Sequence, residues 1–159
     1  MQLTIRPLDT SSDLELEQYR ALEQALDDHV YGGHQEESLA QLRAGLEDTP
    51  YWTVRRWIAL AETLEGGEML VGRAMTFTPQ QENLESISVG AAVHPAHRGQ
   101  CIATALVEEA LLPAIEQSHD VHIALHVGAM KIRGALRRLE RQPHPGQHAV
   151  HQLLQVPAA

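Results

Sequence analysis

The 159-residue chain contains one cysteine, so no disulfide can form within it, which fits a reducing compartment. It has no apolar run near the roughly 20 residues that a membrane-spanning helix needs. Residues 1–9 lack the apolar core of a signal peptide, and internal repeats and low-complexity linkers are absent from the sequence. We therefore expect one cytoplasmic domain covering residues 1–159, without membrane association.

Basic residues are also scarce, since 12 Lys and Arg stand against 21 Asp and Glu, a formal net charge of −9. Nonspecific binding to nucleic acid needs a basic surface, so no nucleic-acid partner is expected. The acidic excess favours cationic partners such as amines, or serves only to keep the surface soluble. Hydrophobic residues make up 43% of the chain and charged residues 21%, which is typical of a folded globular domain.

Hydrophobic periodicity predicts strands and helices along the whole chain. Ser12 and Glu15 are spaced as a capping box, and the helix that follows carries an apolar stripe. The stripe consists of Leu16, Tyr19, Leu22, Leu26 and Val30. The expected elements are a strand at 3–8, helices at 13–29 and 39–46, strands at 55–61, 69–77 and 84–93, a helix from 102, a strand at 121–127, a helix at 130–141, and a strand or helical turn at 148–156. This order predicts an α+β fold, a sheet flanked by helices.

Three local features refine this expectation. Gly90 lies inside a strand and is compatible with a β-bulge. Pro113 removes a helical hydrogen bond, so we expect a kink or an early end near Leu112. The aromatic side chains of Tyr51, Trp52 and Trp57 are expected to pack in or against the core rather than to form a substrate cage.

The segment 93–111 is the most informative part of the sequence. A strand-like run ends at His94-Pro95, a short basic loop with Gly99 follows, and an amphipathic helix begins at about Ile102. A loop of this kind presents backbone N–H groups, and the helix adds the positive end of its dipole. The pattern predicts a site for a phosphate-bearing ligand, or else an ordinary strand-to-helix turn.

Residues 98–103, R-G-Q-C-I-A, resemble the acyl-CoA pyrophosphate loop of the GNAT N-acetyltransferase superfamily, R/Q-x-x-G-x-G/A. The preceding V-x-P and the following A-L-V are also typical of that family, and the resemblance is most specific over 86–117. It implies a mixed, mostly antiparallel central sheet flanked by helices, and acetyl-CoA as the acyl donor. The implied cofactor-binding residues are Ala91, Ala92, Val93, Arg98, Gly99, Gln100, Cys101, Ile102, Ala103 and Thr104.

Cys101 departs from the family pattern because it stands where the first motif glycine belongs. Its sulfur would crowd a pyrophosphate, and a positive φ there would cost on the order of 1 kcal/mol. We expect weakened rather than abolished binding. A nucleophilic role for this thiol at a helix N-terminus is a further alternative, although the family mechanism needs none.

The resemblance also implies how transfer proceeds. The strand end 90–93 would pair with the pantetheine arm, and one backbone N–H would polarise the thioester carbonyl. Glu85 shares the strand parity of Ala91 and Val93, so it is the candidate general base, with a solvated carboxylate as the alternative. The family's tyrosine acid is missing: Arg137 stands at the comparable place, and no tyrosine follows Tyr51.

Other chemistry is less well supported. The acceptor would lie near 27–34, where two aspartates suit a cationic amine and two glycines allow a lid; a solvated helix end is the alternative. The ten histidines do not form a convincing metal site, since Cys101 is the one sulfur ligand, so no metal is expected. His94 and His97 flank the loop, where they contact CoA phosphates or simply cap the loop.

We therefore expect an N-acetyltransferase that moves an acetyl group from acetyl-CoA to a primary amine of a small molecule or peptide, by direct attack in a ternary complex. One alternative is a catalytically degenerate GNAT-fold domain that binds acyl-CoA or a protein. A second alternative is a domain that does not bind CoA and self-associates through its sheet edge. The sequence leaves a homodimer open.

Overall fold

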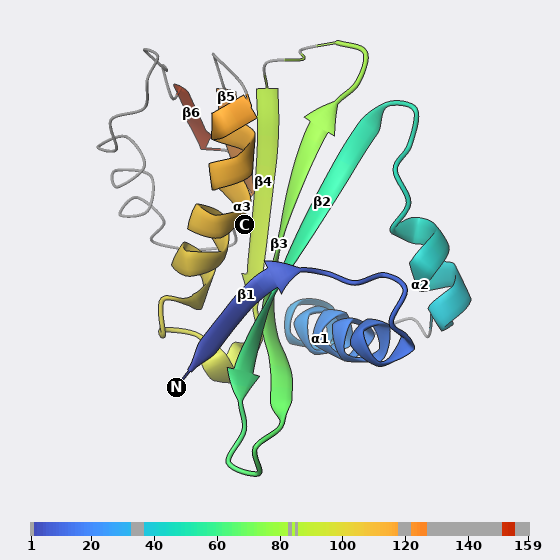
Figure 1. Cartoon of the computed structure of the whole chain (residues 1–159), viewed down its shortest axis with the longest axis vertical. Coiled ribbons are helices and arrows are strands. Elements are labelled where there is room, and N and C mark those ends of the chain that lie inside the picture. Colours follow the sequence, from blue (N-terminus) through green and yellow to red (C-terminus); the bar gives the residue numbers. More distant parts are fainter. Residues whose placement is uncertain are drawn as a thin grey trace.

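The computed structural model describes residues 2–32, 37–82, 84, 86–117, 122–126 and 151–154. They form a six-stranded sheet with the strands in chain order and helices on both faces (Figure 1). The strands are β1 (Leu3–Pro7), β2 (Trp52–Glu62), β3 (Glu68–Pro79), β4 (Ser86–Val93), β5 (His122–His126) and β6 (His151–Leu154). The helices are α1 (Asp13–Tyr31), α2 (Leu39–Gly45), the 3-10 turn η1 (Pro95–His97) and α3 (Ile102–Gln117). Pairing is antiparallel from β1 to β4 and parallel from β4 to β6, which confirms the α+β prediction.

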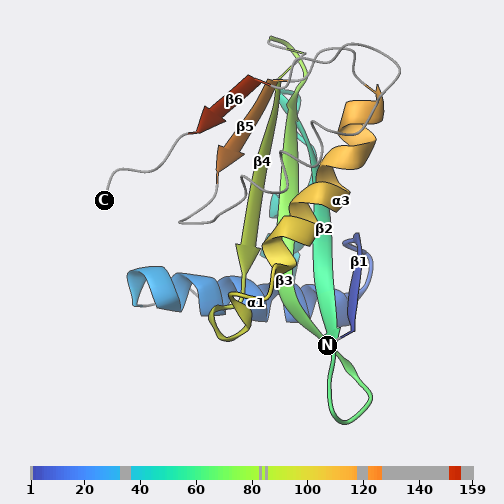
Figure 2. The same cartoon turned by 90° about the vertical axis from the view of Figure 1, so that its left-hand side faces the viewer.

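Two apolar clusters hold the helices against the sheet. Successive residues of β2 point to opposite faces. Trp57 and Ala59 pack toward α3, and Ile58 and Leu60 pack toward α1 and α2. Helix α1 crosses one face, while α3 covers the other (Figure 2). The sheet is therefore buried on both faces at its centre.

The start of α1 is capped differently from the expectation. Ser12 Oγ accepts the Glu15 N–H at 3.3 Å, as a capping box requires. The Glu15 carboxylate instead accepts from the Asp9 N–H at 2.9 Å and from Arg6, so only half of the box forms. The helix ends at Tyr31, where Gly32 adopts φ 70° and donates its N–H to Asp28.

The apolar stripe of α1 is shorter than predicted. Its residues from Leu16 to Leu26 are buried, but Val30 is 64% exposed. The last turn of α1 therefore extends past the sheet that it covers. The prediction that three aromatic residues pack in or against the core is only partly correct. Trp57 is buried, but Tyr51 and Trp52 are exposed, so the prediction is wrong for those two residues.

The expected bulge at Gly90 is not observed. Gly90 pairs in continuous register with Met75 on one side and His126 on the other. The register shift lies instead between β2 and β3, next to Gly72. A Cβ atom at Gly72 would lie 3.1 Å from both Ala92 O and Leu106 Cδ1, so this glycine is where α3 approaches the sheet closely.

Helix α3 continues past Pro113 to Gln117, so an early end near Leu112 is wrong, while the alternative of a kink there stays a prediction. One lost backbone hydrogen bond is offset by the burial of Leu106 and Leu111 against the sheet. The C-terminal segment left open between strand and turn contains the strand β6, parallel to β5. The predicted helix at 130–141 lies outside the described residues.

Candidate functional site

Strand β4 presents a backbone edge at its C-terminal end. Its pairing with β3 continues to Val93, but its pairing with β5 ends at Gly90. The His94 N–H donates to Val71 O at 2.8 Å, and hydrogen-bonding direction alternates along an antiparallel ladder. Ala91 and Val93 therefore direct their backbone polar groups to the β5 side. Within the described ranges no strand pairs with this part of the edge.

The loop after β4 is held in place by short-range contacts. The Ala96 N–H donates to His94 Nδ1 at 3.2 Å, so His94 caps η1. The His94 and His97 rings meet edge to face with centroids 5.7 Å apart. This observation supports the capping role considered for these histidines.

Two residues with positive φ turn the chain into α3. Gly99 has φ 79° and Cys101 has φ 60°. The first backbone bond of the helix runs from the Ala105 N–H to Cys101 O at 3.1 Å. The N–H groups of residues 102–104 precede that bond and have no partner within the helix. Because Ile102 and Ala103 are buried, these donors are presented from a fixed position beside an exposed turn.

Cys101 is the one non-glycine residue with positive φ in the described part of the chain. The backbone conformation that the resemblance required for this position is therefore present, although the side chain is not glycine. The Cys101 side chain is exposed.

Arg98 connects the loop to two other elements. Its Nε donates to Val93 O at 3.3 Å, and its Nη1 lies 2.8 Å from His29 Nε2 in the last turn of α1. One side of the guanidinium is thus engaged within the protein. The second terminal nitrogen, Nη2, is the donor left to reach an anion.

A partly buried polar cluster on the α1 face was not anticipated from the sequence. Arg73 on β3 forms a two-pronged ion pair with Glu23 of α1, and Tyr19 Oη lies 3.8 Å from Met75 Sδ. Burial raises the pKa of Tyr19. Burial alone would lower the pKa of Arg73, but the hydrogen bonds that Arg73 donates to the Glu23 carboxylate, together with nearby negative charge, raise it overall. The available signal was the four-residue spacing of Tyr19 and Glu23, which places both on one face of α1.

Arg56 lies on the same face and is incompletely satisfied. Its Nη1 donates to Leu46 O at 2.7 Å, while its buried Nε has no hydrogen-bond partner. Burial lowers the pKa of Arg56. Arg56 pairs in register with Met75, and Met75 pairs with Gly90, so this cluster lies beside the strand end described above.

Several predicted site residues are not placed. Glu85, the candidate base, lies outside the described residues, as do Arg137 and the end of the expected acceptor segment from Gly33 to His34. In the described ranges no group of three or more His, Cys, Asp or Glu side chains is arranged to hold a metal ion. No described helix is long and apolar enough to cross a membrane.

No protein-family model matches the chain, and no curated protein matches it. Solved structures do match. A ribosomal-protein-alanine N-acetyltransferase from Brucella melitensis biovar Abortus 2308 has a TM-score of 0.58 at 16% identity, covering 98% of this chain and 100% of that chain. An aminoglycoside acetyltransferase from an uncultured soil metagenomic sample has a TM-score of 0.53 at 20% identity, with both chains fully covered.

A tandem GNAT protein from the clavulanic acid biosynthesis pathway is also similar, with a TM-score of 0.58 and 21% identity over 74% of this chain. The match spans 34% of that longer protein. The first two structures are acetyltransferases by name and match along their full length, and the third is named a GNAT protein. The chain therefore has the GNAT fold, as the loop at 98–103 predicted.

Proposed function

We propose that the protein is an N-acetyltransferase that transfers an acetyl group from acetyl-CoA to a primary amine by direct attack in a ternary complex. The observation that carries the proposal is the open edge of β4 beside a left-handed loop and the start of α3. An acyl-CoA molecule needs both features, an extended edge for its pantetheine amides and N–H donors for its pyrophosphate. Cytoplasmic acetyl-CoA would supply the donor.

The pyrophosphate would be held by backbone donors from Gln100 to Thr104. The positive end of the α3 dipole favours its negative charge. Arg98 would add a charge-assisted hydrogen bond through Nη2. Ala91 and Ala92 leave space for the pantetheine arm because their side chains are small, and the Ala91 or Val93 N–H would polarise the thioester carbonyl.

The reaction asks for little beyond alignment. The amine nitrogen attacks the thioester carbonyl carbon, the C–S bond breaks, and the amine loses a proton while the CoA thiolate gains one. Glu85 is the proposed base, directly or through water. The two full-length similar structures are named for a ribosomal-protein alanine and an aminoglycoside, which supports an amine acceptor without distinguishing its class.

The alternative is a domain that binds acyl-CoA without transferring it. One observation supports it: the exposed Cys101 stands where the resembled motif has glycine. In either case a homodimer stays a prediction from the sequence.

Thermal unfolding at increasing acetyl-CoA concentrations tests both the transferase proposal and the alternative of an acyl-CoA-binding domain. Stabilisation should follow RT ln(1 + [L]/Kd), about 2.7 kcal/mol at a ligand concentration of 100 Kd. Arg98→Ala should weaken binding about tenfold through the lost charge-assisted bond. No shift with millimolar acetyl-CoA would exclude both readings. Release of free thiol with a panel of amines then distinguishes an enzyme from a binder, and Glu85→Gln should slow that release without changing acetyl-CoA affinity.

A further inference from the structure

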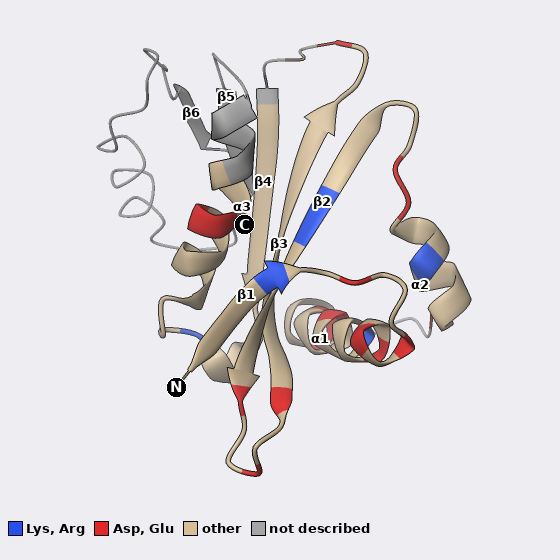
Figure 3. Cartoon of the chain, in the orientation of Figure 1, with Lys and Arg blue, Asp and Glu red and all other residues tan. Residues whose placement is uncertain are grey.

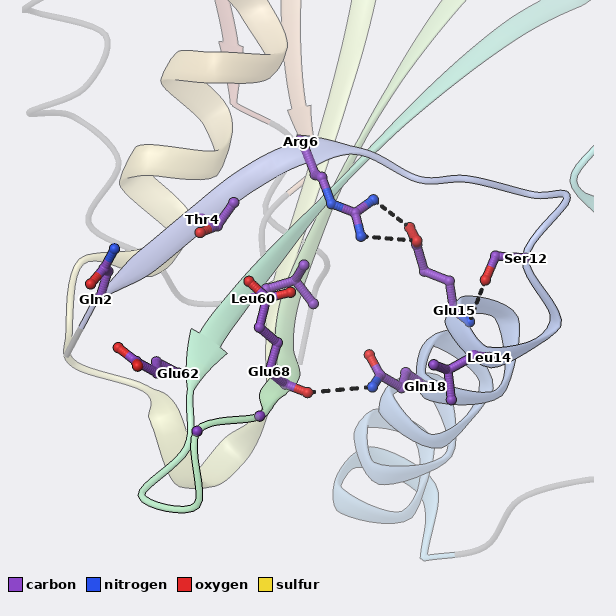
Figure 4. Close-up of a pocket in the computed structure, with 12 residues that line it drawn as sticks. Gln2, Thr4, Arg6, Ser12, Leu14, Glu15, Gln18, Leu60, Glu62 and Glu68 are labelled. Carbon is purple, nitrogen blue, oxygen red and sulfur yellow. Dashed lines mark hydrogen bonds and ion pairs between the residues drawn. The ribbon is translucent and has the colours of Figure 1, made fainter.

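A cavity of about 650 Å³ lies at the β1 edge of the sheet, on the face that α1 crosses (Figure 4). Gln2 and Thr4 of β1 line one side of it, and Leu60 of β2 forms its floor. Leu14 and Gln18, from the first turns of α1, form the opposite wall. Its volume falls in the range of small-molecule binding sites.

This cavity is separate from the proposed acetyl-CoA loop. The first turns of α1 line the cavity, whereas His29 in its last turn contacts the loop through Arg98. With a rise of 1.5 Å per residue, about 20 Å of helix separates Glu15 from His29. A ligand in the cavity does not reach the open edge of β4, so the transfer reaction proposed above does not use this space.

One wall of the cavity is already neutralised. Arg6 forms a two-pronged ion pair with Glu15 at 2.8 and 3.0 Å, and Glu15 also accepts the Asp9 N–H. The Glu15 carboxylate raises the pKa of Arg6. Since this pair satisfies itself, Arg6 does not neutralise the remaining acidic side chains of the cavity by direct contact.

Two carboxylates at the hairpin end of the cavity form no such ion pair, although Glu68 attracts Arg6 at longer range. Glu62 and Glu68 are cross-strand partners in the β2–β3 register, where like charges are destabilising. Neither side chain forms an ion pair with any residue in the described ranges. Figure 3 shows acidic residues gathered at this end of the hairpin. In Figure 4 Glu62 lies on the side of the open space near Gln2, and Glu68 borders the same space.

The remaining polar groups that line the space can accept hydrogen bonds. Thr4 offers a hydroxyl oxygen, and Gln2 and Gln18 offer amide oxygens. Gln18 Nε2 is already directed to the Glu68 backbone carbonyl at 3.4 Å, which leaves its amide oxygen for another partner. Leu60 and the 72% exposed Leu14 add apolar surface between these polar ends.

We propose that this cavity binds an organic cation carrying primary ammonium groups on an aliphatic stem. Each ammonium group offers three donors and no acceptor, which matches two unpaired carboxylates and several oxygen acceptors. The aliphatic stem would pack against the apolar side chains of Leu60 and Leu14. A hard divalent cation would need six or more oxygen ligands in regular geometry, and two carboxylates do not provide that number. The site lies beyond the proposed transfer reaction and does not depend on it.

Calorimetric titration of the full chain with 1,5-diaminopentane, without acetyl-CoA and at low ionic strength, tests the proposal. The Glu62→Gln/Glu68→Gln variant should bind at least tenfold more weakly than the unsubstituted protein. A control variant, Glu47→Gln/Glu65→Gln, removes the same charge from exposed positions outside the cavity and should bind within twofold of the unsubstituted protein.

Two further probes identify the chemistry. The diol 1,5-pentanediol, which has the same stem without charge, should produce no binding heat. Removing the repulsion between Glu62 and Glu68 should also raise the Tm of the ligand-free double variant, which shows that it folds. Three results would overturn the proposal. One is equal diamine binding by all three proteins, and another is binding of magnesium chloride as tight as that of the diamine. The third is no diamine binding at about 10 mM, an order-of-magnitude ceiling for a specific site. Because acetyl-CoA is absent, failure here leaves the proposed transferase function untouched.

Discussion

At the scale of single residues, Cys101 is expected to have two effects. Its positive φ strains the backbone, and its sulfur would crowd a bound pyrophosphate. An L-residue at φ 60° costs about 1–2 kcal/mol relative to its preferred conformation. Glycine adopts this conformation readily but loses more freedom on folding. We expect Cys101→Gly to raise the free energy of unfolding by up to about 1 kcal/mol and to tighten acetyl-CoA binding.

A matched variant separates the two effects. Cys101→Ala keeps the Cβ and removes only the sulfur, so it should leave the free energy of unfolding unchanged while relieving crowding at the loop. Urea denaturation and acetyl-CoA titration of both variants measure this. If alanine and glycine stabilise the protein equally, backbone strain at this position is not the cause.

Tyr19 predicts how stability changes at alkaline pH. Its folded-state pKa is raised by burial above the ordinary value of 10.0, so above pH 10 the unfolded chain loses a proton that the folded chain keeps. Stability contributed by Tyr19 is complete below pH 10 and is lost as pH rises, at up to 1.36 kcal/mol per pH unit. Urea unfolding between pH 8 and 11.5 should show a steeper loss for the unsubstituted protein than for Tyr19→Phe.

Tyr51→Phe removes the same hydroxyl group at an exposed position and serves as the control variant. Absorbance at 295 nm gives an independent readout, because the buried Tyr19 should ionise only when the protein unfolds. Parallel slopes for the unsubstituted protein and Tyr19→Phe would contradict the assignment.

At the scale of elements, the contact between α3 and the sheet depends on Gly72. A Cβ at this position would meet Ile102 and Leu106 at 3.3 and 3.1 Å and the carbonyl oxygen of Ala92 at 3.1 Å. The side chains can shift, but the backbone oxygen cannot do so without moving β4. We expect Gly72→Ala to lower the free energy of unfolding by about 1–3 kcal/mol.

Gly45 serves as the comparison, since a Cβ there meets no atom within 4 Å and its position is helical. Gly45→Ala should be neutral or stabilising by up to about 1 kcal/mol. Chemical denaturation of both variants measures the difference. A Gly72→Ala protein as stable as the parent would show that α3 accommodates the extra methyl group.

The elements were largely predictable from sequence, and the exceptions have local causes. Periodicity located the strands β1 to β5, because alternation in β1 and apolar runs in β2 to β4 reflect burial on one or both faces, but it did not decide between strand and turn at β6. It failed at Pro113, since burial of the α3 face overrides a single lost hydrogen bond. It also misplaced the bulge, because close approach of α3 to Gly72 is a tertiary contact that sequence spacing does not encode.

The candidate site was predictable only in part. The loop from Arg98 to Thr104 carries a local signal, a glycine and a helix start, so its position followed from the sequence. The contact of Arg98 with His29 joins residues 69 positions apart and leaves no such signal. The Arg73–Glu23 pair and the cavity at β1 are of the same kind, assembled from segments distant in the chain.

At the scale of the whole molecule, two apolar clusters share one sheet. Leu106 belongs to the cluster under α3 and Ile58 to the cluster under α1, and both side chains are fully buried. We expect Leu106→Ala and Ile58→Ala each to lower the free energy of unfolding by about 2–5 kcal/mol. Because the clusters lie on opposite faces of the same strands, each variant should still unfold in one cooperative transition.

Scanning calorimetry measures this directly. Equal calorimetric and van't Hoff enthalpies in both variants would agree with a single cooperative unit. Two resolved transitions, with only one of them shifted by each substitution, would show that the layers unfold separately.

Helix α1 gives the molecule one further property. Its first turns line the cavity at β1 and its last turn contacts Arg98 in the loop after β4, so the same helix contributes to both proposed binding sites. Thermodynamic linkage then imposes a symmetry on the two occupants. By whatever factor a cation in the cavity changes the affinity for acetyl-CoA, acetyl-CoA changes the affinity for that cation by the same factor.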